Sequence, residues 1–429
     1  MGFPAITRMG GEGGTFSALR HRDFRLLWTG LVVSAIGTWM QIVAQSLLVL
    51  KITHGSAFAL GTVSLAQAAS FFLFALLGGS IADRLDKRRL LLCTQAISAT
   101  LALILGILTL TGAIQFWMIL VLAFLNGTVL SFDQPARGSL IPALVPPRDL
   151  MNAISLQSMV FNGASLLGPA LAGVTVGLIG YAGNFFLNAA SFAGVLFALY
   201  AMRVPAGAAR THQQPVLAAI HDAMGTVRRE PVLPWILSGY GAMLFFGPSA
   251  ALILPVYAVN ILHIGPERLG LLFSSSGLGA IAGSLLAASM GDVRRKGMLY
   301  FAGMLLWVAA LAAFAVSEWL WLSMLALAVF GMGQTLAGAT TITLLQTRVA
   351  GQMRGRMMSL ITLLVMGVRP LGDFPAGTLI AVIGGPGTVL LSSAAVGAYG
   401  LFVFLTHPTV RSAASLPTPA NEAVMGGQS

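Results

Sequence analysis

Two ionisable residues, Arg369 and Asp373, lie inside a long apolar run of the sequence. They stand near the middle of residues 356–383, well away from either end of that run. A charged side chain at the centre of a bilayer costs at least about 2.5 kcal/mol on insertion scales, so such residues are expected to face a bundle interior and to have partners.

This pair has two interpretations. Residues four apart share one face of a helix, so Arg369 and Asp373 could form a mutual structural pair. The Arg-before-Asp order is the less favourable orientation, however, and Pro370 and Pro375 disturb the helical spacing. We therefore favour the interpretation in which Asp373 takes up and releases protons while Arg369 sets its pKa.

Uncharged polar residues inside the apolar runs are the next candidates for chemistry. Such groups usually face the bundle interior or a wet cavity, where they bond a neighbouring helix or contact a bound small molecule. The sequence leaves both roles open for each residue. The candidate substrate-cavity residues are Gln41, Gln45, Gln67, Asn126, Gln157, Asn162, Gln334 and the aromatic Tyr240.

Other kinds of chemistry lack the residues that they need. The six His residues fall in loops or at the ends of apolar runs, so we expect no metal site and no cluster of catalytic bases. None of the three Lys residues is followed by Ser or Thr, which excludes the phosphate-binding end of a P-loop. We therefore expect no cofactor, and a membrane-embedded enzyme is disfavoured.

The candidate residues are positioned by apolar runs that are long enough to cross a membrane. Only 9% of the 429 residues are charged and 57% are hydrophobic. A run of about 20 apolar residues crosses a bilayer as a helix, because its backbone polar groups must pair within the segment. We predict an all-α membrane protein with twelve transmembrane helices at 24–50, 57–82, 89–111, 115–134, 152–179, 183–202, 235–261, 268–290, 297–316, 319–345, 356–383 and 387–407.

The distribution of Lys and Arg predicts the orientation of these spans. Cytoplasmic loops carry the excess of positive charge, and 21 of the 24 basic residues fall on one face, against Lys51 and Arg268 on the other. We therefore expect a multi-pass protein of the cell membrane with both termini in the cytoplasm. The net charge of +11 reflects basic loops facing anionic lipid, and no basic face with aromatic or groove-reading elements indicates nucleic acid.

Two halves of the chain resemble each other. Residues 154–173, ISLQSMVFNGASLLGPALAG, align with residues 358–377, MSLITLLVMGVRPLGDFPAG, at a constant offset of 204. Two pseudo-symmetric six-helix halves are the architecture of alternating-access transporters. The predicted organisation is a cytoplasmic N-terminal segment (1–23), a first half (24–202), a central loop with an interfacial helix near 215–229 (203–234), a second half (235–407) and a disordered cytoplasmic tail (408–429).

Several stretches resemble one family. Residues 78–92, GGSIADRLDKRRLLL, resemble the signature loop between helices two and three of the major facilitator superfamily, with Asp86 where many members carry Gly. Residues 133–156 and 354–377 are similar to the subgroup that includes the enterobactin exporter and macrolide-type efflux proteins. The resemblance covers residues 20–407 and implies the major facilitator fold.

The resemblance also implies a cytoplasmic latch between the halves. Asp83 would face the N-terminus of helix eleven, and Arg84 or Arg88 would pair with Asp133. Positive-inside anchoring remains the alternative for the basic residues, and Asp133 could instead pair with its i+4 neighbour Arg137. The predicted latch residues are Gly79, Asp83, Arg84, Lys87, Arg88, Asp133, Arg137, Asp292 and Arg294.

We expect a secondary active transporter that exports small amphipathic, drug- or siderophore-like molecules by alternating access in exchange for protons. Export rather than import follows here from the resemblance. A proton symporter or a facilitator for uptake of a small polar solute is the alternative. The expected partners are the small-molecule substrate, protons and the lipid bilayer, and we expect a monomer.

Overall fold

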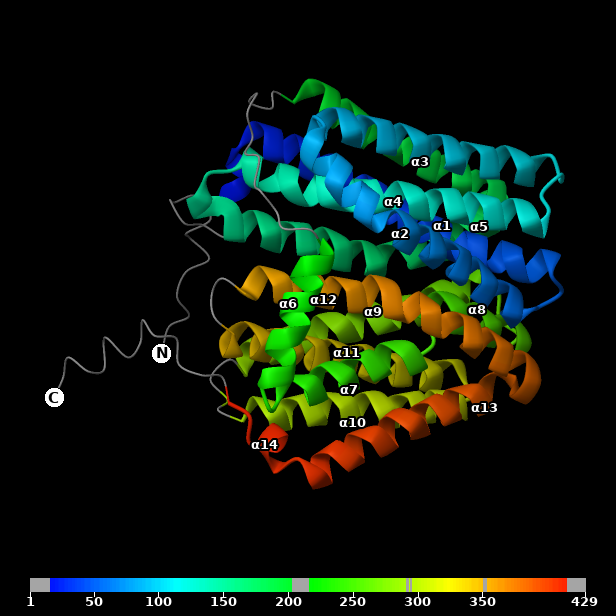
Figure 1. Ribbon diagram of the computed structural model, residues 1–429. Coiled ribbons are helices and arrows are strands. Elements are labelled where there is room, and N and C mark those ends of the chain that lie inside the picture. Colours follow the sequence, from blue (N-terminus) through cyan, green and yellow to red (C-terminus); the bar gives the residue numbers. More distant parts are fainter. Residues whose placement is uncertain (1–15, 203–215, 291–292, 294, 350–352, 415–429) are drawn as a thin grey trace, which may run out of the picture. The chain divides into compact units, whose positions relative to one another are not determined.

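A computed structural model of the chain describes residues 16–202, 216–290, 293, 295–349 and 353–414. Throughout these ranges the regular structure is helical, with no strand (Figure 1). The chain divides into two compact units. Unit 1 holds residues 1–54, 66–213 and 265–270, and unit 2 holds residues 55–65, 214–264 and 271–429.

Unit 1 is built around a core in which α1 packs along α5 and α3 packs on both α4 and α5. Phe24, Leu91, Leu140, Leu156 and Leu199 are among the buried residues of this core. Its elements are η2 (Ser17–Arg20), α1 (Arg22–Ile52), α2 (Ala57–Arg84) from residue 66 onward, α3 (Lys87–Leu110), α4 (Phe116–Leu144), η3 (Pro147–Asp149) and α5 (Leu150–Ala201).

In unit 2, α10 packs on α11, and α13 packs on α7 and α10. A second core cluster lies where α6, α7, α11 and α12 meet, around Leu233, Leu345 and Met357. The elements are residues 57–65 of α2, α6 (Val216–Arg229), α7 (Leu233–Phe246), α8 (Ala250–Asn260), α9 (Pro266–Ser289) from residue 271 onward, α10 (Lys296–Ala315), α11 (Leu320–Arg348), α12 (Arg354–Leu363), a π-helical turn (Leu364–Val368), α13 (Arg369–Thr406) and α14 (Pro408–Arg411).

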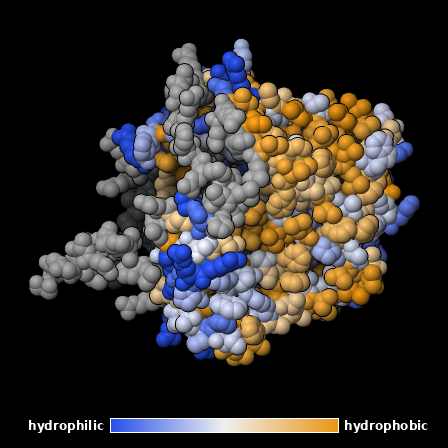
Figure 2. Space-filling model, in the orientation of Figure 1, coloured by the Kyte–Doolittle hydropathy of each residue, from blue (hydrophilic) through white to orange (hydrophobic). Residues whose placement is uncertain are grey.

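The surface over these helices is apolar. Figure 2 shows hydrophobic residues across most of the visible described surface. Leu178, Phe197 and Val382 are 78, 67 and 75% exposed. Exposed apolar area on this scale is unsuitable for water and suits contact with lipid tails.

Ten helical segments in the described ranges are long and apolar enough to cross a membrane. Two of them, Pro147–Ala201 and Arg369–Thr406, are each interrupted by a glycine at positive φ, namely Gly180 and Gly384. Positive φ is adopted most easily by glycine, so each glycine allows a tight connection between two helical stretches. These two glycines are separated by the offset of 204 that relates the two repeats. Dividing both segments at these glycines would give the expected number of twelve spans. That number stays a prediction.

The duplication is visible in one helix crossing of each unit. In unit 1 a Cβ added to Gly270 would lie 2.7 Å from the carbonyl oxygen of Pro169, and in unit 2 one added to Gly61 would lie 2.8 Å from that of Asp373. Pro169 and Asp373 are related by the same offset. Small residues let the two backbones approach closely at each crossing.

One predicted boundary is wrong. The run expected to end at residue 134 continues as α4 to Leu144, through Pro135 and Pro142. Proline removes a backbone hydrogen bond. The extension nevertheless buries Leu140 and Ile141 completely or almost so, and this burial offsets the loss.

The helix expected near 215–229 is confirmed as α6, Val216–Arg229. Ala223 and Val227 are buried against residues of α7, α11 and α12, so part of its apolar face contacts protein. Its position at the membrane surface stays a prediction.

Candidate functional site

The span expected at 235–261 is broken into two helices. Helix α7 ends at Phe246, and α8 begins at Ala250 after Gly247, Pro248 and Ser249. The Ser249 hydroxyl accepts a hydrogen bond from the amide of Leu252 at 3.2 Å, which caps α8. Discontinuous membrane helices place backbone donors inside the membrane, where a polar site needs them. The predicted span is therefore present as the apolar segment Leu233–Asn260, with a break between α7 and α8 inside it.

The opposing helix is also irregular. Between α12 and α13 the residues Leu364–Val368 form a π-helical turn. Pro370 follows directly, and a proline ring clashes with the carbonyl four residues earlier and offers no N–H. Widening of the preceding turn relieves both effects, and such π turns frequently accompany functional sites. Arg369 begins α13 at this point, one turn before Asp373.

These two irregularities meet at the Asp373 carboxylate. Asp373 is only 3% exposed, and its Oδ1 accepts a hydrogen bond from the backbone N–H of Ser249 at 2.8 Å. The Ser249 and Ser64 hydroxyls and the Arg369 guanidinium also interact with this carboxylate. A carboxylate at the start of α8 satisfies an amide that the helix cannot satisfy itself, and it interacts favourably with the helix dipole.

Close backbone packing fixes this arrangement. A Cβ added to Gly372 would clash with the carbonyl oxygen of Phe245, the penultimate residue of α7. Only glycine therefore lets α13 come this near to α7. The approach holds Asp373 against the break that follows α7.

Arg369 is not paired as a simple i,i+4 interaction would require. It makes no hydrogen bond or ion pair with any residue that the structure describes, and its Nε is buried without a partner. Its guanidinium does interact electrostatically with Asp373 and with the buried Tyr240 of α7. The mutual structural pair, which we disfavoured, is not formed.

Asp133 lies in a second buried polar cluster, in unit 1. Its carboxylate is 3% exposed and accepts hydrogen bonds from the Thr94 hydroxyl at 3.0 Å and the Gln95 amide at 2.7 Å. Arg137 pairs with it at 2.5 Å as the i+4 neighbour. Of the two alternatives for Asp133, the local pair is the one present.

Of the two predicted partners of Asp133, Arg84 and Arg88, Arg88 is not paired with it, and the Arg84 side chain lies outside the described residues. Arg88 donates instead to the carbonyl oxygens of Leu199 and Tyr200, at 2.5 and 2.6 Å, near the end of α5. The last carbonyls of a helix lack intrahelical donors and attract cations, which explains this choice.

Of the remaining predicted latch residues, Lys87 is the one whose side chain the structure describes. Lys87 begins α3 and is half-buried. Asp292 and Arg294 lie outside the described residues, as do the side chains of Asp83 and Arg84 and the surroundings of Gly79. The latch stays a prediction.

The predicted cavity residues differ in their surroundings. Gln41 accepts a hydrogen bond from Asn188 of α5 at 2.7 Å, which is a helix–helix bond. Tyr240 is buried and Asn162 is exposed. The remaining residues, which are half-buried, are Gln45, Gln67, Asn126, Gln157 and Gln334.

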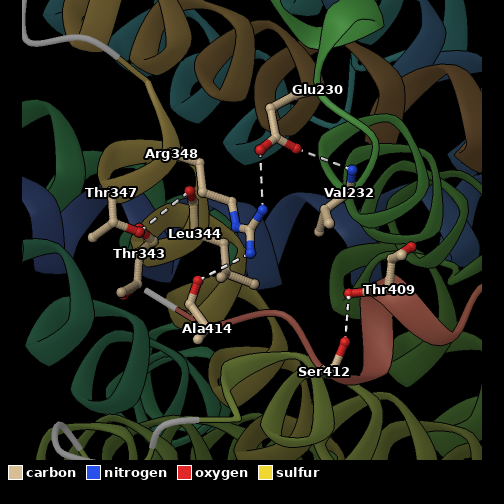
Figure 3. A network of polar contacts seen from close by, with 9 residues as sticks. All are labelled: Glu230, Val232, Thr343, Leu344, Thr347, Arg348, Thr409, Ser412 and Ala414. Atoms are coloured by element: carbon tan, nitrogen blue, oxygen red, sulfur yellow. Dashed lines mark hydrogen bonds and ion pairs between the residues drawn. The ribbon is translucent and has the colours of Figure 1, made fainter. Parts of the chain in front are cut away.

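Sequence reasoning missed a polar network in unit 2 around Arg348 (Figure 3). Arg348 pairs with Glu230 at 3.0 Å and donates to the carbonyl oxygen of Ala414 at 3.1 Å. The Gly297 amide donates to Ala413 at 3.0 Å, so residues 408–414 are fastened to α10 and α11. The expected disorder of the tail is wrong for these residues, and those beyond them lie outside the described part.

A metal site is not indicated. Within the described ranges, no three His, Cys, Asp or Glu residues are grouped closely enough to hold a metal ion.

Comparison with known proteins gives one consistent family. The family model for transmembrane secretion effectors matches residues 13–423. The enterobactin exporter EntS of Citrobacter koseri is 24% identical over 385 residues, covering 89% of this chain and 90% of the relative. An uncharacterised transporter of the same superfamily, YfiS of Bacillus subtilis, is 26% identical over 67% of this chain and 68% of its own length.

Solved structures give the same fold at low identity. A bacterial homologue of the lysosomal transporter spinster superposes with a TM-score of 0.73 at 14% identity, covering 92% of this chain and 99% of that one. A bacterial homologue of the iron transporter ferroportin gives a TM-score of 0.68 at 15% identity, covering 88 and 98%. The predicted major facilitator fold is confirmed.

Proposed function

Because the chain belongs to the transmembrane secretion effector family of the major facilitator superfamily, we propose that it exports small amphipathic molecules by alternating access. The similarity to enterobactin exporters over most of both chains supports export and a drug- or siderophore-like cargo. The basic loops favour the cell membrane, with both termini in the cytoplasm. The sequence has no P-loop, so we assign the energy to a gradient, and we propose that a monomer is sufficient.

We propose protons as the coupling ion and Asp373 as the residue that carries them. The observation that supports this role is the bond from the Ser249 amide to the buried carboxylate. In its charged form Asp373 holds the start of α8 against α13. Protonation removes the charge that interacts with the α8 N-terminus and weakens that hold, so proton binding changes how firmly α8 is anchored.

The groups facing Asp373 come from four helices. Ser249 at the start of α8 and Ser64 of α2 supply hydroxyls, Arg369 of α13 supplies a positive charge, and Tyr240 of α7 interacts with Arg369. Among these groups Arg369 is charged and Tyr240 is titratable, whereas the two serine hydroxyls are neutral donors.

The test is Asp373→Asn in proteoliposomes. An Asn side-chain oxygen can still accept from the Ser249 amide, so the variant removes the titratable charge while it keeps the anchor. We expect it to lose cargo uptake driven by an imposed pH gradient and to keep cargo binding and cargo exchange. Asp149→Asn is the matched control, because it also removes a buried carboxylate charge.

If Asp373→Asn still pumps at the wild-type rate under a pH gradient, Asp373 is structural and coupling must be sought at Asp133 or Asp83. The direction of transport is tested separately by accumulation of dyes, antibiotics and catecholates in cells with and without the protein. Higher accumulation in cells that contain the protein contradicts export and favours the uptake alternative.

A further inference from the structure

Arg369 is a cation within a membrane-spanning helix. Its N–H groups donate no hydrogen bond to a described residue. Its Nε is buried without a partner, and it forms no ion pair with a described residue. The acid nearest in sequence, Asp373, accepts a hydrogen bond from the Ser249 amide instead. A guanidinium at this depth is costly unless something accepts its protons.

The other described acids of unit 2 that form ion pairs are engaged elsewhere. Glu230 is paired with Arg348, and Asp222 is paired with Arg356. Both acids precede α7, near the end of the helices where α6 lies (Figure 1). No described acid of this unit other than Asp373 interacts with Arg369.

A second unused donor lies beside Arg369. Tyr240 is 9% exposed and interacts electrostatically with Arg369. The Tyr240 hydroxyl has no hydrogen-bond partner among the described residues. This hydroxyl lies close to Gly338 of α11, because a Cβ added to Gly338 would be 3.0 Å from the hydroxyl oxygen. Two donors, one from α7 and one from α13, are thus near each other, and neither donates a hydrogen bond to a described residue.

We infer that Arg369 and Tyr240 bind an anionic group of the cargo, a carboxylate on an apolar body. A guanidinium presents a planar fork of N–H donors that matches two oxygens of such a group, and a phenol adds a third bond. Arg369 then has a second role besides its effect on Asp373: it selects acids over neutral molecules of the same shape. The inference rests on the proposed function only in identifying the anion with transported cargo.

The test measures binding at one pH with no gradient, so it does not depend on coupling. The full chain in nanodiscs is titrated by equilibrium dialysis with matched pairs: 1-naphthoate and 1-naphthamide, salicylate and salicylamide, 2,3-dihydroxybenzoate and 2,3-dihydroxybenzamide. We expect the wild-type protein to prefer the acid of at least one pair by about tenfold or more, the factor that corresponds to about 1.4 kcal/mol. Arg369→Gln removes that preference, and Tyr240→Phe reduces it.

Arg89→Gln is the control, since Arg89 is an exposed basic residue at the start of α3. It leaves the preference unchanged. Arg369→Lys keeps the charge without the planar fork, so we expect it to show an intermediate preference for the acid. If Arg369→Gln is not monodisperse, the acid preference of Arg369→Lys is the result that tests the inference. The inference is overturned if the wild-type protein prefers none of the acids. It is also overturned if Arg369→Gln prefers the acid as strongly as the wild-type protein does. Where Arg369→Gln cannot be purified intact, the same result for Arg369→Lys overturns it.

The two proposals can fail separately. If Asp373→Asn pumps normally while Arg369→Gln loses the acid preference, only proton coupling through Asp373 is refuted. If Arg369→Gln keeps the preference while Asp373→Asn stops pumping, only the anion site is refuted.

Discussion

Removing the Asp133 carboxylate is expected to destabilise unit 1 mainly through Gln95. The Thr94 hydroxyl has an alternative acceptor in the carbonyl oxygen of Leu91 at 3.1 Å, and the Arg137 side chain is 25% exposed. Gln95 has neither advantage, because it is 3% exposed and its Oε1 is already buried without a partner. Loss of Asp133 therefore leaves a whole buried amide unsatisfied.

The magnitude follows from these three bonds. A buried amide without a partner costs about 1–3 kcal/mol, and the partly exposed ion pair adds about 1 kcal/mol, so Asp133→Ala should cost about 2–4 kcal/mol. Gln95→Leu alone removes one hydrogen bond to a charged group, worth about 1.5–3 kcal/mol. In the Asp133→Ala background the same change removes an unsatisfied amide, so the double variant is expected to be more stable than Asp133→Ala.

The assay is a double-mutant cycle on the apparent free energy of unfolding, measured by SDS titration in mixed micelles. We expect a coupling energy of at least about 2 kcal/mol between the two sites. Thr94→Val in the Asp133→Ala background is the matched control and should give no comparable recovery. Simple additivity of Asp133→Ala and Gln95→Leu would refute this reasoning.

Two further predictions concern unit 2. Gly372→Ala should push α13 away from the Phe245 carbonyl and destabilise the protein by about 1–3 kcal/mol. The control is Gly163→Ala, where an added Cβ meets nothing within 4 Å, and it should be neutral or stabilise the protein by up to about 1 kcal/mol. Equal melting temperatures for the two variants would contradict this prediction. Arg348→Ala should make the segment that follows α13 more sensitive to limited proteolysis than Glu230→Gln does, because Arg348 binds that segment directly and Glu230 does not; identical cleavage rates would argue against the fastening.

Local spacing predicted much of this structure. The pairing of Arg137 with Asp133 was one of two stated alternatives, and it follows from the i+4 rule alone. Helix α6 was expected within a residue of its observed start, because its apolar residues repeat at helical spacing. The burial of Asp373 followed from the cost of a charge in a bilayer.

Partners that are backbone groups could not be predicted in the same way. Backbone N–H and C=O groups are the same in almost every residue, so the residue type does not show which of them is free to bond. The break or end of a helix frees them, as it does for the Ser249 amide and for the carbonyl oxygens of Leu199 and Tyr200. The break before α8 did have a signal in the order Gly247, Pro248, Ser249, which ends one helix and caps the next. The apolar composition of residues 235–261 as a whole led us to predict a single span there and to overlook this signal.

The fastening of residues 408–414 has a consequence for biogenesis. The chain is synthesised from its N-terminus, so the acceptors Ala413 and Ala414 emerge only after α13 has been made. Until then the Gly297 amide and the Arg348 guanidinium, on helices made earlier, lack these acceptors. A nascent chain that stops after α13 thus lacks partners for one donor at the start of α10 and one at the end of α11, which distinguishes it chemically from a finished one.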